Sequence, residues 1–435
     1  MSATHLVVLV HGLWGAPTHL HHLRDVLQEQ HPTSTTGLHI LLPKSNANYF
    51  TYDGIEVGAE RITNEIEAAI KELKDQGSTI RKISITGYSL GGLVARYIVG
   101  LLYKNGLFDD IEPVNFTTFA SPHLGVRAPS HGYGTEFWNF MGSRTLSSTG
   151  QQMFLVDDFR GTGRNLLEIM TDPNSAFIAG LCRFKNRYLY ANTINDRSVP
   201  YFTAAISKTD PFVDLNAIDA NYLPNQKVVL NPANPATPRK PAPKVALTLY
   251  ERLSISERTR KELAFYALFT TMLPLAVPLF LVNAGYQTYK SAQRIRLHEA
   301  GDMFDLQRYS IPLLEEVQAG QNRVIERLAA EQANHAGQYL PTPPPEPLSP
   351  VSSSESLAKV DTDDALEKNS QFPILALTAG QLKMIDNLDQ VGFVKFSAHI
   401  INVRHTHAAI VVRTPKESFA EGREVVDHWA KRFEV

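Results

Sequence analysis

The stretch ISITGYSLGGLVARYIVG, residues 83–100, carries the most specific signal of the fold. It holds the pentapeptide GYSLG (residues 87–91), a G-x-S-x-G pattern placed between an apolar β-rich run and a helical run. In this context a sharp turn from strand to helix strains the serine backbone, and the glycines let strand and helix approach each other. The hydroxyl is then exposed at a helix amino terminus, where backbone N–H groups can meet an anion. The pattern predicts that Ser89 is a nucleophile, the alternative being an ordinary serine in a glycine-rich helix start.

Short apolar β-rich runs alternate with helical runs up to about residue 210. The predicted strands are residues 6–10, 38–42, 83–86, 114–120 and 188–192. The predicted helices are residues 19–30, 54–75 and 90–104. Apolar strands that alternate with helices are typical of a mostly parallel, doubly wound sheet with both faces covered. The fold class is therefore α/β.

The rest of the chain changes in composition several times. Residues 221–250 are predicted to form an extended linker, because proline and asparagine are frequent there. Residues 338–371 are Pro/Ser-rich and of low complexity, which predicts disorder. From residue 372 the chain again has a folded pattern, with a strand-like run at 391–403 and a closing helix at 421–433. We therefore expect one catalytic domain made of residues 1–220 and 372–435, interrupted by about 150 residues.

Within the interruption, residues 251–337 hold an uncharged apolar segment, Leu263–Val282, and a helical apolar stripe over 303–332. Twenty residues of helix would span about 30 Å, the thickness of a bilayer core. However, Pro274 and Pro278 would bend such a helix, and basic residues flank it on both sides. The segment is predicted to insert into a lipid surface as a bent hairpin or in its plane, and the alternative is a buried core helix.

The overall totals exclude several classes of protein. A formal net charge of -2 argues against a nucleic-acid-binding protein, which usually has a basic surplus. A single cysteine, Cys182, excludes an intramolecular disulfide and a cysteine zinc site, and it favours a reducing intracellular compartment. The first residues, MSATHLVVLVHG, lack the basic start of a signal peptide and are interpreted as the first strand.

A nucleophilic serine needs donors for the oxyanion that develops in acyl transfer. In the fold that carries a G-x-S-x-G turn, one N–H comes from the residue after the nucleophile, here Leu90. The other comes from a loop such as the stretch HGLWG (residues 11–15) after the first strand, most simply from Leu13. A plain β-turn is the alternative interpretation of that loop.

The serine also needs a base and an orienting carboxylate, which follow it in the order Ser, Asp or Glu, His. Asp196 lies in a turn directly after the strand predicted at 188–192, where the acid is expected. Less clearly placed acids are Asp157, Asp172 and Asp210, and a turn-capping role is the alternative for Asp196. The base is expected in the loop after a late strand, which favours His407 and keeps His405 in reserve. His428, in the closing helix, is expected to cap or pack.

Five ordered motifs together resemble a family of fungal serine esterases that includes lipid-droplet phospholipases and monoacylglycerol lipases. The motifs are HGLWGAPTHL, ITGYSLGGLVARYIVG, TTFASPHLGVRAP, YANTINDRSVPYFTA and THAAIVVR...VVDHWAKRF. The resemblance covers residues 5–215 and about 390–433, and it implies an α/β-hydrolase with Ser89 as nucleophile, Asp196 as acid and His407 as base. The family often has Asp and Ala at the positions of His405 and Thr406, and PHLG (122–125) is interpreted as structural.

The expected function is that of a serine lipase or phospholipase without metal or organic cofactor. Its substrate would be a glycerolipid ester at a lipid-droplet or endoplasmic reticulum surface, with the catalytic domain facing the cytosol. The aromatic stretch between Gly125 and Arg187 is interpreted as a cap where acyl chains enter; its aromatic residues are Tyr133, Phe137, Trp138, Phe140 and Phe154. The alternatives are an acyltransferase or thioesterase on the same scaffold, and a catalytically inactive membrane tether.

Overall fold

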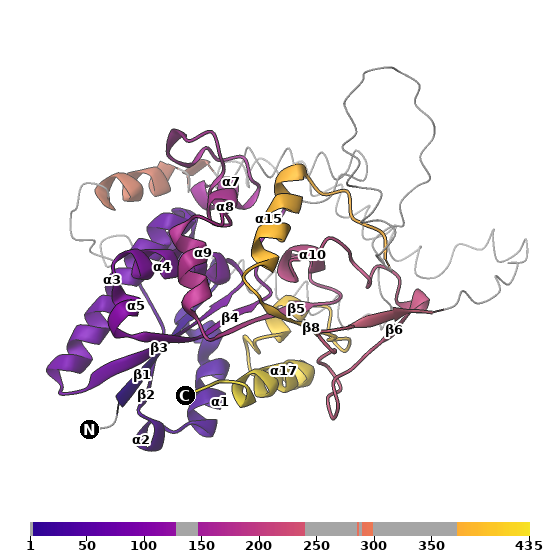
Figure 1. Cartoon of the computed structure of the whole chain (residues 1–435), viewed down its shortest axis with the longest axis horizontal. Coiled ribbons are helices and arrows are strands. Elements are labelled where there is room, and N and C mark those ends of the chain that lie inside the picture. Colours follow the sequence, from indigo (N-terminus) through magenta and orange to yellow (C-terminus); the bar gives the residue numbers. More distant parts are fainter. Residues whose placement is uncertain (1–2, 128–146, 240–284, 287–288, 299–371) are drawn as a thin grey trace, which may run out of the picture.

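A six-stranded sheet in which every neighbouring pair is parallel lies at the centre of the fold (Figure 1). The computed structural model describes residues 3–127, 147–239, 285–286, 289–298 and 372–435. The strand order is β2-β1-β3-β4-β5-β8. The strands are β1 (Ala3–Val10), β2 (Leu38–Leu41), β3 (Thr79–Tyr88), β4 (Glu112–Phe119), β5 (Asn186–Asn192) and β8 (Val394–Ala398). The expected mostly parallel α/β sheet is confirmed.

Helices surround the sheet and are mostly short. The longer ones are α1 (His21–Gln30), α3 (Ile55–Asp75), α4 (Leu90–Lys104), α9 (Ala176–Arg183), α15 (Ala379–Asp389) and α17 (Ala420–Lys431). The short α-helices are α2 (Thr33–Thr36), α5 (Leu107–Asp110), α7 (Ser148–Met153), α8 (Leu166–Ile169), α10 (Tyr201–Ala204) and α16 (Thr406–Ala409). The 3-10 helices are η1 (Pro17–Leu20), η2 (Asn48–Tyr52), η3 (Phe159–Gly161), η4 (Leu215–Ala217) and η6 (Glu417–Phe419). Residues 289–298 are also helical.

The alternation of side chains along β1 divides the core into two layers. Leu6, Val8 and Val10 pack with α3 and α4 on one face of the sheet, whereas Val7 and Leu9 pack with α1 and α17 on the other (Figure 1). Because successive residues of a strand point to opposite faces, an unbroken apolar strand requires cover on both sides. The run LVVLV therefore explains the two helical layers.

Two distant parts of the chain build one sheet. Strand β8, from the C-terminal part, pairs with β5 in the register Tyr188 to Val394. This arrangement places the loops after β1, β3, β5 and β8 at the same edge, because the carboxyl ends of parallel strands coincide. Residues far apart in sequence can therefore meet there.

The start of the stretch expected as an extended linker is packed on the sheet. Residues 228–230 are buried, the Leu230 N–H donates to the Ser397 carbonyl, and the His399 N–H donates to the Val228 carbonyl. Nearby, β6 (Ile218–Ala220) pairs antiparallel with β7 (Ala236–Pro238). The apolar run VVL (228–230) buries its side chains although prolines and asparagines lie on both sides of it, and the composition of the stretch hid this run.

Several predicted segments lie outside the described residues. These are residues 240–250 of the expected linker, the apolar segment Leu263–Val282, the helical stripe over 303–332 and the Pro/Ser-rich stretch 338–371. Four aromatic residues of the expected cap are also outside them, whereas Phe154 is buried. No helix within the described ranges combines the length and apolarity needed to cross a membrane.

Candidate active site

Ser89 occupies the sharp turn between β3 and α4. Its backbone has φ 56° and ψ -129°, in a region that residues with a side chain rarely adopt. The flanking glycines make the turn possible: a Cβ on Gly87 would lie 2.5 Å from the Gly91 carbonyl oxygen, and one on Gly91 would lie 2.2 Å from that of Val10. The G-x-S-x-G pattern is therefore required by close backbone approach, as the sequence indicated.

The structure brings Ser89, His407 and Asp196 into one hydrogen-bonded row. The His407 Nε2 lies 2.9 Å from the Ser89 Oγ, and the His407 Nδ1 lies 2.8 Å from the Asp196 Oδ2. His407 is in α16 after β8, and Asp196 is in the loop after β5. A base that hydrogen-bonds both a serine and a carboxylate is the arrangement that activates the serine hydroxyl for attack.

The carboxylate of Asp196 is firmly oriented. Its side chain is only 2% exposed, and its Oδ1 accepts hydrogen bonds from the backbone N–H groups of Ser198 (3.1 Å) and Val199 (2.9 Å). Its Oδ2 accepts from the Asn192 Nδ2 at 2.8 Å as well as facing His407. The acid thus caps its own turn and orients the base at the same time, so the two interpretations of Asp196 are compatible.

The other predicted candidates lie elsewhere in the fold. His405 is exposed as the residue before α16, and the His428 Nδ1 hydrogen-bonds the Tyr190 hydroxyl at 2.9 Å. Among the acids, Asp172 pairs with Arg164, while Asp157 and Asp210 accept backbone N–H groups of Leu166 and Phe212. Of the candidate bases and acids named above, only His407 and Asp196 form the row with Ser89.

The loop after β1 lies against the serine. A Cβ on Gly12 would be 2.7 Å from the Ser89 Cβ and 3.2 Å from its Oγ, so only glycine allows this approach. The loop is fixed by hydrogen bonds from the Gly15 N–H to the Gly12 carbonyl (3.0 Å) and from the Trp14 N–H to the Thr51 Oγ1 (3.1 Å). A rigid loop at this distance can hold a donor toward a group bound on Ser89.

Two backbone N–H groups next to the serine are free for a ligand. Leu90 is the first residue of α4, so its N–H has no partner within the helix. Within the described part of the chain, neither the Leu90 nor the Leu13 N–H donates to a backbone or side-chain acceptor. These are the two groups predicted as oxyanion donors, and their availability fits that role.

Sequence reasoning missed two residues that support the row. The Tyr88 hydroxyl donates to the His407 carbonyl at 2.9 Å, and its ring lies 5.1 Å from the imidazole. Tyr88 is buried, which raises the pKa of its hydroxyl and keeps it a donor. The second is Asn192, described above. Tyr88 is the variable second position of the pentapeptide and Asn192 ends a strand, so neither had a distinguishing signal.

The PHLG turn after β4 has the structural environment that was expected. His123 is fully buried with its Nε2 2.9 Å from the Thr118 Oγ1, and burial lowers its pKa well below the ordinary value. Its carbonyl accepts from the buried Arg96 guanidinium at 3.3 Å. Arg96 also donates to the Met170 carbonyl at 3.0 Å, and burial lowers its pKa to about 9. Arg96 thus ties the helix after the nucleophile to the β4 loop.

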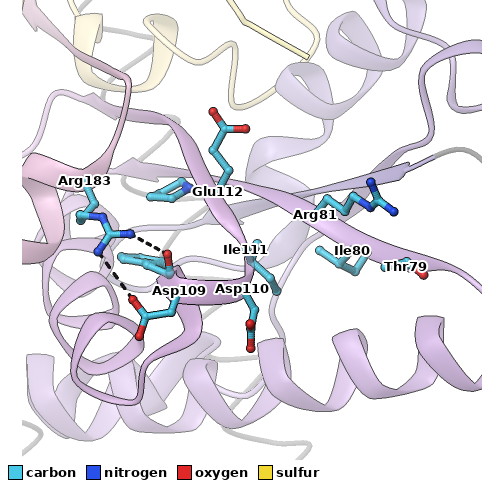
Figure 2. Close-up of a pocket in the computed structure, with 10 residues that line it drawn as sticks. Thr79, Ile80, Arg81, Asp109, Asp110, Ile111, Glu112 and Arg183 are labelled. Atoms are coloured by element: carbon cyan, nitrogen blue, oxygen red, sulfur yellow. Dashed lines mark hydrogen bonds and ion pairs between the residues drawn. The ribbon is translucent and has the colours of Figure 1, made fainter.

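A cavity of about 740 Å³ lies at the opposite edge of the sheet (Figure 2). Its walls include Thr79 at the start of β3 and Glu112 at the start of β4, with the Arg183 and Asp109 ion pair beside them. Ser89 follows the other end of β3, so this cavity is separate from the serine.

Comparison with known proteins agrees with this geometry. Residues 1–209 match the model of a family described as "Putative serine esterase (DUF676)". "Putative lipase ROG1" of Saccharomyces cerevisiae is 33% identical over 221 residues, which cover 49% of this chain and 30% of the relative. "Putative lipase C4A8.10" of Schizosaccharomyces pombe is 29% identical over 212 residues, covering 47% and 26%. The expected resemblance to fungal serine esterases is confirmed, and the chain spans less than a third of the length of these relatives.

Solved structures show more distant likenesses. Phospholipase PlaB from Legionella pneumophila is 15% identical with a TM-score of 0.30, covering 45% of this chain and 39% of that one. A structure titled "putative cell surface hydrolase from Lactobacillus plantarum WCFS1" is 13% identical with a TM-score of 0.28, covering 47% of this chain and 75% of that one.

Proposed function

We propose that this chain, whose residues 1–209 match the serine esterase family, is a serine lipase that hydrolyses carboxylic ester bonds of glycerolipids. The observation that carries the proposal is the row of Ser89, His407 and Asp196, joined at 2.9 and 2.8 Å. Two unpaired N–H groups beside the serine complete the set of groups that acyl transfer requires.

The proposed reaction follows from this geometry. The Ser89 Oγ attacks the ester carbonyl carbon while the His407 Nε2 accepts the hydroxyl proton, and Asp196 stabilises the imidazolium. The negative oxygen of the tetrahedral intermediate accepts from the Leu13 and Leu90 N–H groups. His407 then protonates the leaving alcohol, a lysolipid or glycerol, and an acyl group stays on Ser89. A water molecule, deprotonated by His407, releases the fatty acid.

A glycerolipid substrate is favoured by two observations. The two relatives named above carry the word lipase in their names. The chain also has an uncharged apolar segment, Leu263–Val282, between two basic flanks. Cationic side chains near an anionic lipid surface contribute roughly 1 kcal/mol each.

The order of the residues suggests how the segment meets the lipid. Ser89 and Asp196 precede Leu263–Val282 and His407 follows it, yet the three side chains are in contact. Both ends of the segment must then lie on one side of a membrane. The proposal is therefore a bent hairpin or an in-plane anchor on a lipid droplet or endoplasmic reticulum surface, with the catalytic domain in the cytosol.

The first experiment uses the full chain and a Ser89→Ala variant. Both are incubated with a fluorophosphonate probe, and with vesicles or emulsions of phospholipids, diacylglycerol and monoacylglycerol. Labelling and fatty-acid release by the wild type alone support the serine mechanism and identify the head group. Transfer of the acyl group to an added alcohol or thiol, in preference to water, would indicate an acyltransferase. If neither protein is labelled and neither hydrolyses any ester, the catalytic proposal is wrong and a tethering role takes its place.

A further inference from the structure

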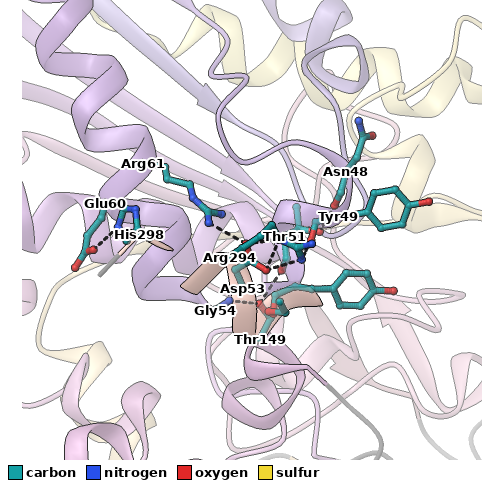
Figure 3. A network of polar contacts seen from close by, with 12 residues as sticks. Asn48, Tyr49, Thr51, Asp53, Gly54, Glu60, Arg61, Thr149, Arg294 and His298 are labelled. Atoms are coloured by element: carbon teal, nitrogen blue, oxygen red, sulfur yellow. Dashed lines mark hydrogen bonds and ion pairs between the residues drawn. The ribbon is translucent and has the colours of Figure 1, made fainter. Parts of the chain in front are cut away.

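A buried ion-pair cluster joins two parts of the chain that the sequence does not relate (Figure 3). The carboxylate of Asp53, next to η2, has no exposed side-chain surface. It accepts from the Arg294 Nε at 2.9 and 3.1 Å and from the Nη2 at 2.7 Å, and it pairs with the Arg61 Nη2 at 2.9 Å. Both guanidinium groups also lie over the Phe50 ring, at 5.4 Å for Arg294 and 5.2 Å for Arg61.

Helix 289–298, which contains Arg294, is thereby held on the catalytic domain. Arg294 is buried and donates a further hydrogen bond to the Tyr49 carbonyl at 3.3 Å. Ser291, also buried, donates to the Tyr52 carbonyl at 3.4 Å. At the end of the helix, the His298 Nε2 lies 2.8 Å from a Glu60 carboxylate oxygen of α3. A buried bidentate pair of this kind fixes orientation as well as contact, because its geometry is restrictive.

The same η2 helix holds the loop that carries the proposed oxyanion donor. The Thr51 hydroxyl accepts from the Trp14 N–H at 3.1 Å, and the Asn48 N–H donates to the Gly15 carbonyl at 2.8 Å. Only one short element therefore separates helix 289–298 from the loop that lies against Ser89. Hydrogen bonds from the helix to η2, and from η2 to the loop, therefore fix the position of the helix relative to the active site.

The two elements that contact η2, the loop after β1 and helix 289–298 with the residues just before it, carry exposed aromatic side chains. Trp14, on the active-site loop, is 45% exposed. Tyr286, just before helix 289–298, is 40% exposed, and Tyr289, its first residue, is 61% exposed. Lys290 lies 5.9 Å from the Tyr286 ring. Tryptophan, tyrosine and lysine are the residues that favour the head-group region of a lipid surface, because each joins an apolar body to a polar end.

We infer that Trp14, Tyr286, Tyr289 and Lys290 form a lipid-contacting surface beside the active site, held in place by the Asp53–Arg294 ion pair. The inference rests on the proposed function. The position of the surface in the chain favours a lipid over a protein partner, since Leu263–Val282 ends three residues before Gly285. The lysine complements the phosphate of a phospholipid head group. Contact through this surface would place the active-site loop at the lipid from which the substrate is drawn.

The test compares two substrates in the full chain. One is a soluble short-chain nitrophenyl ester, and the other is a phospholipid in phosphatidylcholine vesicles with or without phosphatidylserine. The variant Tyr286→Ser/Tyr289→Ser is expected to lower vesicle binding and vesicle hydrolysis by about tenfold, with hydrolysis of the soluble ester unchanged. Tyr222→Ser is the matched control, because Tyr222 is a tyrosine of similar exposure (41%) on the β6–β7 side.

The ion pair is tested with Arg294→Gln, which leaves Asp53 paired with Arg61 and so avoids an unpaired buried carboxylate. This variant is expected to bind vesicles as the wild type does but to hydrolyse vesicle lipid several-fold more slowly. Its control is Arg296→Gln, which removes an exposed cation from the same helix. Unchanged vesicle hydrolysis in both the tyrosine and the Arg294 variants would overturn the inference, and so would an equal loss on both substrates.

The outcome separates this inference from the proposed function. If the wild type hydrolyses neither substrate, the proposed function fails, and vesicle flotation alone still tests the surface. In that case, equal vesicle binding by the wild type and the double tyrosine variant overturns the inference of a lipid-contacting surface. If only the double tyrosine variant loses vesicle binding, the lipid-contacting surface is supported although the proposed hydrolase activity is not.

Discussion

The hydroxyl of Tyr88 donates a hydrogen bond to the carbonyl of His407 at 2.9 Å, so the residue before Ser89 holds the backbone of the histidine that meets Ser89. The two side chains also face each other, with ring centroids 5.1 Å apart. One residue of the strand-to-helix turn thus positions a histidine that is 319 residues away in sequence. The turn presents Ser89 and, through Tyr88, also orients the histidine that is hydrogen-bonded to it.

Removing the Tyr88 hydroxyl should slow catalysis. We expect Tyr88→Phe to lower kcat about three- to tenfold with little change in KM, because a buried hydrogen bond contributes about 1 kcal/mol. Tyr88→Leu, which also removes the ring, should have a larger effect. Tyr190→Phe is the control, since that buried hydroxyl bonds His428 instead of the base. Equal kcat values for Tyr88→Phe and the wild type on a soluble ester would contradict the positioning role.

The two neighbouring histidines should differ sharply in a kinetic test. We expect His407→Ala to lower kcat by roughly 10⁴- to 10⁶-fold, since members of such a row act as a unit. His405→Ala should retain wild-type activity, because His405 is exposed and outside the row. Both variants are measured with a soluble ester after their circular dichroism and melting temperatures have been compared. A large loss in the His405 variant alone would reverse the assignment.

The glycine of the active-site loop offers a test of the oxyanion donors. In Gly12→Ala the new methyl group would lie 2.7 Å from the Ser89 Cβ, so the loop must move away. Loss of one donor typically costs about 10²- to 10³-fold in rate, and a similar fall in kcat is expected here. Gly285→Ala is the control, because a Cβ there meets nothing within 4 Å. Wild-type kcat in a folded Gly12→Ala protein would argue against Leu13 as a donor.

The stability of the domain should fall as the pH drops below neutrality. Burial lowers the pKa of His5 and of His428 to about 4, from an ordinary value of 6.5. Between these values the unfolded chain binds more protons than the folded one, so the free energy of unfolding rises with pH. The stabilisation is complete above about pH 6.5 and is lost toward pH 4.

Urea unfolding across this pH window measures the effect. His428→Gln should reduce the slope of unfolding free energy against pH by at most about 1.4 kcal/mol per pH unit, the value for one proton. Tyr190→Phe keeps the histidine and its bond from the Arg432 Nε but removes the hydroxyl that meets its Nδ1, so this variant should retain the slope. A slope that is the same in wild type and His428→Gln would show that this histidine is protonated equally in both states.

Much of the catalytic geometry could be predicted because it depends on local chemistry. The turn at Ser89 follows from glycines within two residues of it, next to a strand and a helix whose periodicities are visible in the sequence. Asp196 could be placed because an acid in a turn after a strand lies at the edge where parallel strands end. The packed residues 228–230 were missed, since a short apolar run between prolines has no clear period.

The α/β class, the candidate serine and the order of its candidate partners could be predicted from local patterns, because strand, turn and helix signals act over a few residues. The three-dimensional packing places His407, and not His405, against Ser89. His405 and His407 are two residues apart, so a helix would turn them about 200° from each other, and only packing selects the side that meets Ser89. It also decided the contacts of Tyr88 with His407 and of Asp53 with Arg294, which join segments 319 and 241 residues apart. Such contacts depend on how the layers pack, and no local pattern encodes them.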